Sequence, residues 1–291
     1  MKDVTIDNIT DAVLRSLDGT ADPRLKEVLG VLVRKLHEAA VEVSLSHAEW
    51  EELVGFLYRT GAASNEQRNE FILMSDLLGL STLVDMIASA NAPDASERSV
   101  LGPFYIPNAP MLPVGGDLIL DNEGDRVVAL GRVTSTAGEP IAGALLEFWQ
   151  NAANGQYSNV DPEQDDNNLR CRMLSDADGC YSLSTIRPIA YEVPDDATGG
   201  EFIRATGRHC WRPAHLHVRV HAEGYEDLVT EVFNTLDQYI EEDATFGVRS
   251  SLAIPFNRTP TDAERSQFAH VAEPFHMVDF DYVLQPLNAG D

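Results

Sequence analysis

Two histidines in the segment Arg212-Pro-Ala-His-Leu-His217 have a spacing that suits metal binding. The stretch from Leu216 to His221 alternates apolar and polar residues, which is typical of a half-buried strand. Residues two apart on a strand share a face, so His215 and the next histidine should lie side by side, with backbones roughly 6.5–7 Å apart. Two imidazoles that converge in this way can hold one metal ion, although a His-x-His pair also occurs by chance.

Two tyrosines upstream are further candidates. Tyr157 follows a predicted strand that ends at Trp149, and Tyr191 lies in a loop between Pro188 and Pro194. A tyrosine in a β-domain most often contributes its ring to the core and bonds its hydroxyl to a backbone carbonyl. The residues alone therefore leave both roles open, core ring or metal ligand.

The elements that must position these side chains change in type near residue 100. The chain has 291 residues and 44% hydrophobic content, enough for one large or two modest domains. Before residue 100 the pattern is helical, with helices expected over residues 25–36, 46–60 and 71–87. The second begins with the capping-box pattern Ser46-His-Ala-Glu49, and Gly61 should end it. Apolar stripes on such helices are usually core, but they also make a natural dimer surface.

From Gly102 onward, Gly and Pro recur at short intervals, and short strand-like runs lie between them. Strands are expected over residues 127–134, 144–149, 180–184, 216–222 and 228–233. Asp178-Gly179 has the composition of a hairpin turn, and residues 151–168 that of a polar loop. The predicted fold is mainly β with α: a helical domain over residues 1–100 and a β-sandwich domain over residues 101–291.

Charge and cysteine usage restrict the setting. The formal net charge of −26 argues against a nucleic-acid partner, because a phosphate backbone attracts basic surfaces. No run approaches the ~18 apolar residues needed to cross a membrane, and the first residues lack the apolar centre of a signal peptide. Cys171, Cys180 and Cys210 are odd in number and have no Cys-x-x-Cys spacing, which favours free thiols in a reducing cytoplasm.

Other motifs are better explained without a function. Asp176-Ala-Asp-Gly179 resembles part of a calcium loop, but its twelfth position is Arg187, where a bidentate Glu is needed. No nucleophile elbow, phosphate loop or dinucleotide fingerprint occurs. Five further histidines are set aside: His37 and His47 sit in helical segments, and His221, His270 and His276 have no partner at ligand spacing.

Several segments, in order along the chain, resemble the intradiol ring-cleaving dioxygenases, which are non-haem Fe(III) enzymes. The matching segments are Leu101-Gly-Pro-Phe-Tyr105, Gly138-Glu-Pro-Ile-Ala-Gly143, Glu147-Phe-Trp-Gln150, Asn154-Gly-Gln-Tyr157, Ser175-Asp-Ala-Asp-Gly179, Pro188-Ile-Ala-Tyr191 and Gly207-Arg-His-Cys-Trp-Arg-Pro-Ala-His-Leu-His217. The helical N-terminal third resembles the dimerising linker domain of the catechol-type branch. The resemblance therefore extends over nearly the whole chain.

The resemblance implies an iron site and a reaction. Tyr157, Tyr191, His215 and His217 would bind Fe(III), a hard cation that suits anionic phenolate oxygens. The substrate would be a small aromatic diol or triol, cleaved by O₂ between its two hydroxyl-bearing carbons to give a muconate. Tyr191 would leave the metal and take up a substrate proton. Arg212, otherwise a candidate for a surface ion pair, would stabilise negative charge on the ring.

The substrate is expected from a second resemblance. The segment Phe71-Ile-Leu-Met-Ser-Asp-Leu-Leu-Gly79 resembles the hydroxyquinol-type branch, in which residues matching Leu73 and Asp76 lie over the ring. An Asp there could accept a hydrogen bond from a third ring hydroxyl, although without the resemblance it could equally decorate a helix. The expected reaction is cleavage of hydroxyquinol (benzene-1,2,4-triol) to 3-hydroxy-cis,cis-muconate, which tautomerises to maleylacetate. Catechol or a substituted catechol is the alternative.

Three more residues are candidates for the substrate pocket: Pro103, Phe104 and Glu231. The last of these departs from the family pattern, because catechol-type enzymes carry Gln there and hydroxyquinol-type enzymes commonly carry His. A carboxylate near the iron would alter the local charge. The resemblance also implies a homodimer through the N-terminal helices, with lipid as a further candidate at that interface. The alternative from a different class is a metal-free β-sandwich that binds a ligand or partner, with the tyrosines and histidines as core.

Overall fold

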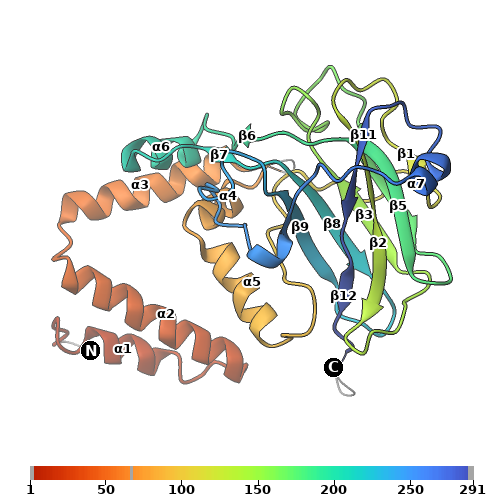
Figure 1. Ribbon diagram of the computed structural model, residues 1–291. Coiled ribbons are helices and arrows are strands. Elements are labelled where there is room, and N and C mark those ends of the chain that lie inside the picture. The colour runs from red at the N-terminus through yellow and green to blue at the C-terminus, as the bar shows by residue number, and fades with distance from the viewer. Residues whose placement is uncertain (1–2, 66–67, 288–291) are drawn as a thin grey trace. The chain divides into compact units, whose positions relative to one another are not determined.

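The computed structural model describes residues 3–65 and 68–287 (Figure 1). It divides into two compact units, Met1–Arg59 and Thr60–Asp291. The helices are α1 (Ile9–Ser16), α2 (Pro23–Glu42), α3 (His47–Ala63), α4 (Glu70–Leu77), α5 (Leu80–Ala90), α6 (Thr198–Thr206) and α7 (Asp262–Gln267), with a 3₁₀ turn at Ser250–Leu252. The strands are β1 (Gly116–Asp117), β2 (Arg126–Ser135), β3 (Leu145–Trp149), β4 (Arg170–Leu174), β5 (Cys180–Ile186), β6 (Tyr191–Glu192), β7 (Trp211–Arg212), β8 (His215–His221), β9 (Leu228–Asn234), β10 (Ala253–Ile254), β11 (Phe275–Asp279) and β12 (Tyr282–Leu284).

Capping side chains mark the starts of α2 and α3, whereas Asn8 at the start of α1 makes no side-chain capping bond. Asp22 accepts hydrogen bonds from the first backbone N–H groups of α2, and Pro23 occupies its first turn. At α3, the Ser46 backbone N–H donates to Glu49 Oε2 over 2.8 Å, and the Glu49 N–H donates to Ser46 Oγ over 3.3 Å. The predicted capping box is confirmed. The predicted end is wrong, because α3 continues through Gly61 to Ala63.

The predicted single helix over residues 71–87 is in fact two helices. Asn69 caps α4 with its side chain, and α4 and α5 meet at an angle of 71°. Gly79, between them, has φ +69, a left-handed conformation that ends a helix. The apolar spacing continues across this break, which is why the sequence pattern did not reveal it. No single helix among the described residues is long and apolar enough to span a membrane.

Two sheets form the sandwich of the second unit (Figure 1). One has the order β1-β5-β2-β11, with β12 also paired to β2, and the other has the order β10-β9-β8-β3-β4. Residues of both sheets, such as Val128 of β2 and Val218 of β8, are buried in one common core. The predicted sandwich is confirmed, and all five predicted strands are present as β2, β3, β5, β8 and β9.

The hairpin predicted at Asp178-Gly179 is wrong. A turn is present there, with Gly179 at φ +73, but it joins β4 of one sheet to β5 of the other. Strand β4 pairs with β3, and β5 pairs with β2, so the chain crosses between the layers at this turn. Turn chemistry is local, whereas the choice of pairing partner depends on distant strands.

Strand β8 is central in its sheet, between β3 and β9. In this register His217 lies opposite Trp149 on one side and opposite Glu231 on the other. The short pair β6–β7 places Tyr191 opposite Arg212. Regular strand pairing thus fixes the backbone of three candidate ligands and two charged neighbours.

Candidate metal centre

Three donor atoms converge at the end of β8. The Nε2 atoms of His215 and His217 are 3.1 Å apart, and Tyr157 Oη lies 3.1 Å from His217 Nε2 and 3.4 Å from His215 Nε2. All three side chains are buried. The two histidines, predicted from their spacing on one strand, and Tyr157, predicted from a distant loop, therefore lie together.

The position of Tyr157 is supported by a ring contact with Phe104 and by the hydrogen bonds of the neighbouring Arg170. Its ring stacks on Phe104 with centroids 4.3 Å apart and an interplanar angle of 13°. Behind it, the buried Arg170 guanidinium donates to Ser158 Oγ over 2.7 Å and to the Phe104 carbonyl over 2.6 Å. Among the described residues no carboxylate lies within ion-pair distance of Arg170, so the nearest anion available to it would be a Tyr157 phenolate. Burial lowers the pKa of this Arg to about 10, and the neighbouring tyrosine opposes that shift.

Tyr191 lies against the same cluster. Its ring centroid is 5.4 Å from that of Tyr157 and 5.6 Å from that of His215. Burial raises the pKa of Tyr191, and the nearby Arg212 charge works in the opposite direction. In the β6–β7 pair Tyr191 lies directly opposite Arg212.

The protonation chemistry of this cluster fits a cation. Burial holds the pKa of His215 below its ordinary value and that of His217 well below it, so both imidazoles are neutral lone-pair donors. Burial also raises the pKa of Tyr157 far above 10, so only a strong local cation would convert it to phenolate. Donors bound to one ion at the roughly 2.0–2.2 Å typical of N and O ligands lie about 3.0–3.5 Å apart. The observed separations match, and the residues therefore fit a metal ion.

A carboxylate stands beside the histidines. Glu231 Oε1 lies 3.3 Å from His215 Nε2 and 3.4 Å from His217 Nδ1. These three residues also satisfy the spacing of a metal-binding cluster, with donors within 4.8 Å of one another. Both Glu231 oxygens are already occupied, however, by Arg212 at 2.7 and 3.0 Å and by the Ser99 hydroxyl at 2.6 Å. Burial raises the pKa of Glu231, but the Arg212 charge, the nearby His215 and the hydrogen bonds from Arg212 and Ser99 together hold that pKa below its ordinary value.

A pocket of about 320 Å³ opens onto the cluster. Five of the predicted residues line it: Leu73, Pro103, Phe104, Tyr157 and Tyr191. Asp76, one helical turn beyond the first of these, is buried and does not line the pocket, and neither do Glu231 and Arg212. The size suits a small aromatic ligand. A second pocket, of about 770 Å³, is lined by none of the predicted residues.

An ion-paired group at the pocket wall was not predicted. Arg68 donates to Glu70 Oε2 over 2.8 Å and pairs with Asp196 at 2.8 Å. The Glu70 carboxylate is fully buried and accepts from the Gly199 backbone N–H over 2.8 Å, which ties the start of α4 to the start of α6. Helix α4 carries both Leu73 and Asp76. No sequence motif marks Arg68 and Glu70 as a group, because their further partners, Asp196 and Gly199, are more than 120 positions away in the chain.

Other contributors were also missed. Arg170, Ser99 and Asp243 are buried polar residues that touch Tyr157's loop, Glu231 and Arg212 respectively. Glu231 itself was predicted as a pocket residue, and its contact with His217 had a signal, since a residue fourteen positions later on the next antiparallel strand can be a direct cross-strand neighbour. The other three depend on loops whose course the sequence does not reveal.

Comparison with known proteins agrees with this geometry. A family model described as dioxygenase matches residues 100–286, and one described as the catechol dioxygenase N terminus matches residues 22–96. The hydroxyquinol 1,2-dioxygenase of Rhizobium sp. (strain MTP-10005) is 43% identical over 94% of this chain and 93% of its own. The 6-chlorohydroxyquinol 1,2-dioxygenase of Cupriavidus pinatubonensis is 40% identical over 96% of this chain and 97% of its own.

A solved structure is similar over nearly the whole length. Hydroxyquinol 1,2-dioxygenase from Pseudomonas putida DLL-E4 superposes with a TM-score of 0.87 at 38% identity, covering 97% of this chain and 99% of that one. The alternative of a binding module without enzymatic activity is therefore wrong, because the matching family models and these relatives are dioxygenases. The chain belongs to the intradiol ring-cleavage dioxygenase family.

Proposed function

We propose that this enzyme uses a non-haem Fe(III) ion, held by Tyr157, Tyr191, His215 and His217, to cleave hydroxyquinol with O₂. The products would be 3-hydroxy-cis,cis-muconate and its tautomer maleylacetate. The convergence of two neutral imidazoles and a buried phenol at 3.1–3.4 Å carries the proposal. When bound, Fe(III) supplies Lewis acidity that makes the coordinated diphenolate ring reactive towards O₂.

The protein groups have separate tasks in this proposal. The aromatic pocket excludes water and orients the ring between Leu73 and the Phe104–Tyr157 stack. Tyr191 would be a phenolate when it binds Fe(III), and by taking the proton of one substrate hydroxyl it would leave the ion as a neutral phenol. Arg212 then presents its N–H groups to the negative charge that develops on the ring.

The tyrosines are favoured over Glu231 as the anionic ligands. The Glu231 oxygens are engaged by Arg212 and Ser99, and freeing one would break the bidentate contact between this carboxylate and the buried guanidinium. Arg170, which has no carboxylate partner among the described residues, supports an anion at Tyr157 instead.

Titration of the iron-free protein with Fe(III) tests the ligand set. We expect one equivalent to bind and to produce a red-brown charge-transfer band, because phenolates donate electron density to Fe(III). Tyr157→Phe should bind iron more weakly and shift the band. Tyr105→Phe, which alters a tyrosine bonded to Glu147 and Arg219 and not to the histidines, is the matched control. Binding without any visible band would favour a two-histidine, one-carboxylate site.

Asp76 supports hydroxyquinol over catechol as substrate. It is buried one turn from Leu73, which lines the pocket, and the charges of Arg212 and Glu231 act on it, although Asp76 itself is not part of the pocket lining. We propose that its carboxylate accepts the hydrogen bond of the third ring hydroxyl. Asp76→Ala should then lower kcat/KM for hydroxyquinol by about 10–100-fold and leave that for catechol within a few-fold, since a hydrogen bond to a charged group contributes about 1.5–3 kcal/mol. Equal losses on both substrates would remove Asp76 from recognition.

The same residue predicts a pH dependence. Burial raises the pKa of Asp76 to about 6, while a hydrogen bond from Ser81 and the Arg212 charge lower it and the charges of Glu231 and Asp85 raise it further. Above this pKa the side chain is an ionised acceptor, and below it the acid is neutral. The ratio of kcat/KM for hydroxyquinol to that for catechol should therefore fall as the pH drops through about 6. A ratio that stays constant from pH 7.5 to 5 would contradict the assignment.

We also propose a homodimer formed through the N-terminal helices, with lipid as a candidate occupant of that interface. In the first unit, α2 and α3 expose apolar side chains that are at least 46% accessible: Leu25, Val28, Leu32, Leu36, Trp50, Leu53, Val54 and Leu57. Faces of this kind favour burial against another surface. Light scattering should give twice the 32.0 kDa chain mass, and Leu32→Glu with Leu36→Glu should give the monomer. Solvent extraction and mass spectrometry would identify any lipid.

The cytoplasm is the compartment that we propose. All three cysteines are free thiols, which a reducing environment maintains. Thiol titration of the freshly isolated protein should therefore find three reactive groups after unfolding, and a disulfide would contradict this location.

A further inference from the structure

The Arg212 guanidinium forms ion pairs with two carboxylates, those of Glu231 and Asp243. Its Nη1 and Nη2 donate to the two Glu231 oxygens over 2.7 and 3.0 Å, and its Nε and Nη2 donate to the two Asp243 oxygens over 3.0 and 3.2 Å. All three side chains are at most 2% exposed. Two bidentate contacts fix the plane of the guanidinium as well as its position.

The Asp243 carboxylate is fixed independently of this contact. It accepts hydrogen bonds from the Thr245 backbone N–H over 3.1 Å, from the Thr245 hydroxyl, and from the Gly247 N–H over 2.8 Å. Gly247 lies close to both side chains of the Arg212–Asp243 pair. A Cβ atom added to this glycine would lie 2.8 Å from Arg212 Nη2 and 3.0 Å from Asp243 Oδ2. The loop is therefore built tightly around the guanidinium, and glycine is needed for this close approach.

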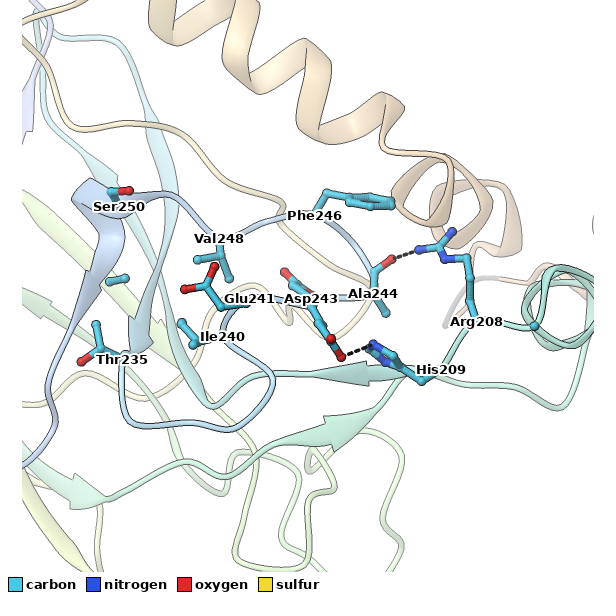
Figure 2. A pocket seen from close by; sticks show the side chains of 13 residues that line it. Arg208, His209, Thr235, Ile240, Glu241, Asp243, Ala244, Phe246, Val248 and Ser250 are labelled. Carbon is cyan, nitrogen blue, oxygen red and sulfur yellow. Dashed lines mark hydrogen bonds and ion pairs between the residues drawn. The ribbon is translucent and has the colours of Figure 1, made fainter.

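The two carboxylates differ in what else they touch. Glu231 contacts both histidines, so replacing it disturbs the metal centre directly. The side-chain hydrogen bonds of Asp243 within the described residues go to Arg212 and to its own loop, and Asp243 also lines the separate 770 Å³ pocket shown in Figure 2. Its charge acts on His215 as well, but the hydrogen bonds that connect its carboxylate to the site all go to Arg212.

We propose that Asp243 is a positioning residue that sets the orientation of Arg212 at the reacting ring, an inference that rests on the proposed function. The sum of charges supports an orienting role. One guanidinium and two carboxylates leave the group with a net charge of −1, so Arg212 does not act as a free positive charge. Its contribution depends on where its N–H groups point, and Asp243 fixes two of the donors that determine this.

Asp243→Asn tests the proposal because it keeps the shape and removes the charge. The amide can present only one acceptor to the two N–H groups. We expect kcat to fall by about 10–100-fold, in line with the effect of a small misplacement near the reacting atoms. Iron content and the charge-transfer band should remain unchanged. Glu242→Gln is the matched control: it removes the same charge one residue earlier, where the exposed carboxylate pairs with His209.

A double-mutant cycle separates positioning from a general structural effect. In an Arg212→Lys background, Asp243→Asn should cost less than about twofold further, because residues that act through one another are not additive. Additive losses would overturn the proposal. If the Asn variant fails to load iron, Gly247→Ala replaces it in the double-mutant cycle with Arg212→Lys. Additive losses of kcat would again overturn the proposal. Ring cleavage by the unaltered protein is measured first, and its absence refutes the proposed function. If the unaltered protein is active but Asp243→Asn has the same kcat as Glu242→Gln, only this inference is refuted.

Discussion

Replacing Arg212 by alanine should lower turnover by about 10²–10³-fold, the usual effect of removing one group that stabilises developing negative charge. Iron should still bind, because the guanidinium contacts the metal ligands without being one of them. The measurements are kcat for ring cleavage and iron content on the same sample. A turnover within a few-fold of the unaltered enzyme would exclude Arg212 from the mechanism.

The same change should also weaken the fold. Truncating Arg212 leaves the buried carboxylates of Glu231 and Asp243 unpaired, which costs about 3–5 kcal/mol in similar cases. The melting temperature of the iron-free variant should therefore fall, and assays belong well below it. Arg219→Ala is the control, because this partly exposed Arg also pairs with two carboxylates, Glu147 and Asp227, and neither of them is a partner of Arg212.

Replacing His217 by alanine should abolish iron loading at ordinary concentrations and ring cleavage with it. Loss of an outer-shell partner typically costs about 10–100-fold in metal affinity, and loss of a direct ligand should cost more. The ring also stacks on Trp149 with centroids 4.7 Å apart, so some stability is lost as well. Metal analysis after dialysis, with the visible band as a second readout, measures the effect.

The matched control for that change is His221→Ala. His221 lies on the same strand and the same face, four residues further along, but it is exposed and pairs with Asp227. It should load a full equivalent of iron and keep its activity. Equal iron content in the two variants would remove His217 from the ligand set.

The sequence predicted the layers of this fold better than its connections. Alternating runs located β8 and β9, and helical spacing located α2 and α3. The two-residue strands β6 and β7 were not predicted, because two residues are too few to show an alternating pattern. They nevertheless place Tyr191 opposite Arg212. The break at Gly79 was missed because both flanking helices are apolar at compatible spacings.

The site residues also differ in how far the sequence predicted them. Spacing alone indicated that His215 and His217 share a face, whereas Tyr157 and Tyr191 became ligand candidates only through family resemblance. Glu231 was noticed as a departure from the family, but its contact with Arg212 depends on strand register and was not foreseen. Asp243 could not be found from the sequence, since only the fold brings a loop residue 31 positions away to the guanidinium.

Oxygen uptake by the iron-loaded enzyme, with hydroxyquinol and catechol in parallel, tests the central claim most directly. Enzyme-free autoxidation of each substrate is subtracted, and the ring-opened product is identified by mass spectrometry with ¹⁸O₂. The account predicts rapid uptake with hydroxyquinol, little with catechol, and both atoms of one O₂ in a muconate-type product. Preference for catechol would contradict the role of Asp76, and uptake with neither substrate would contradict the proposed function.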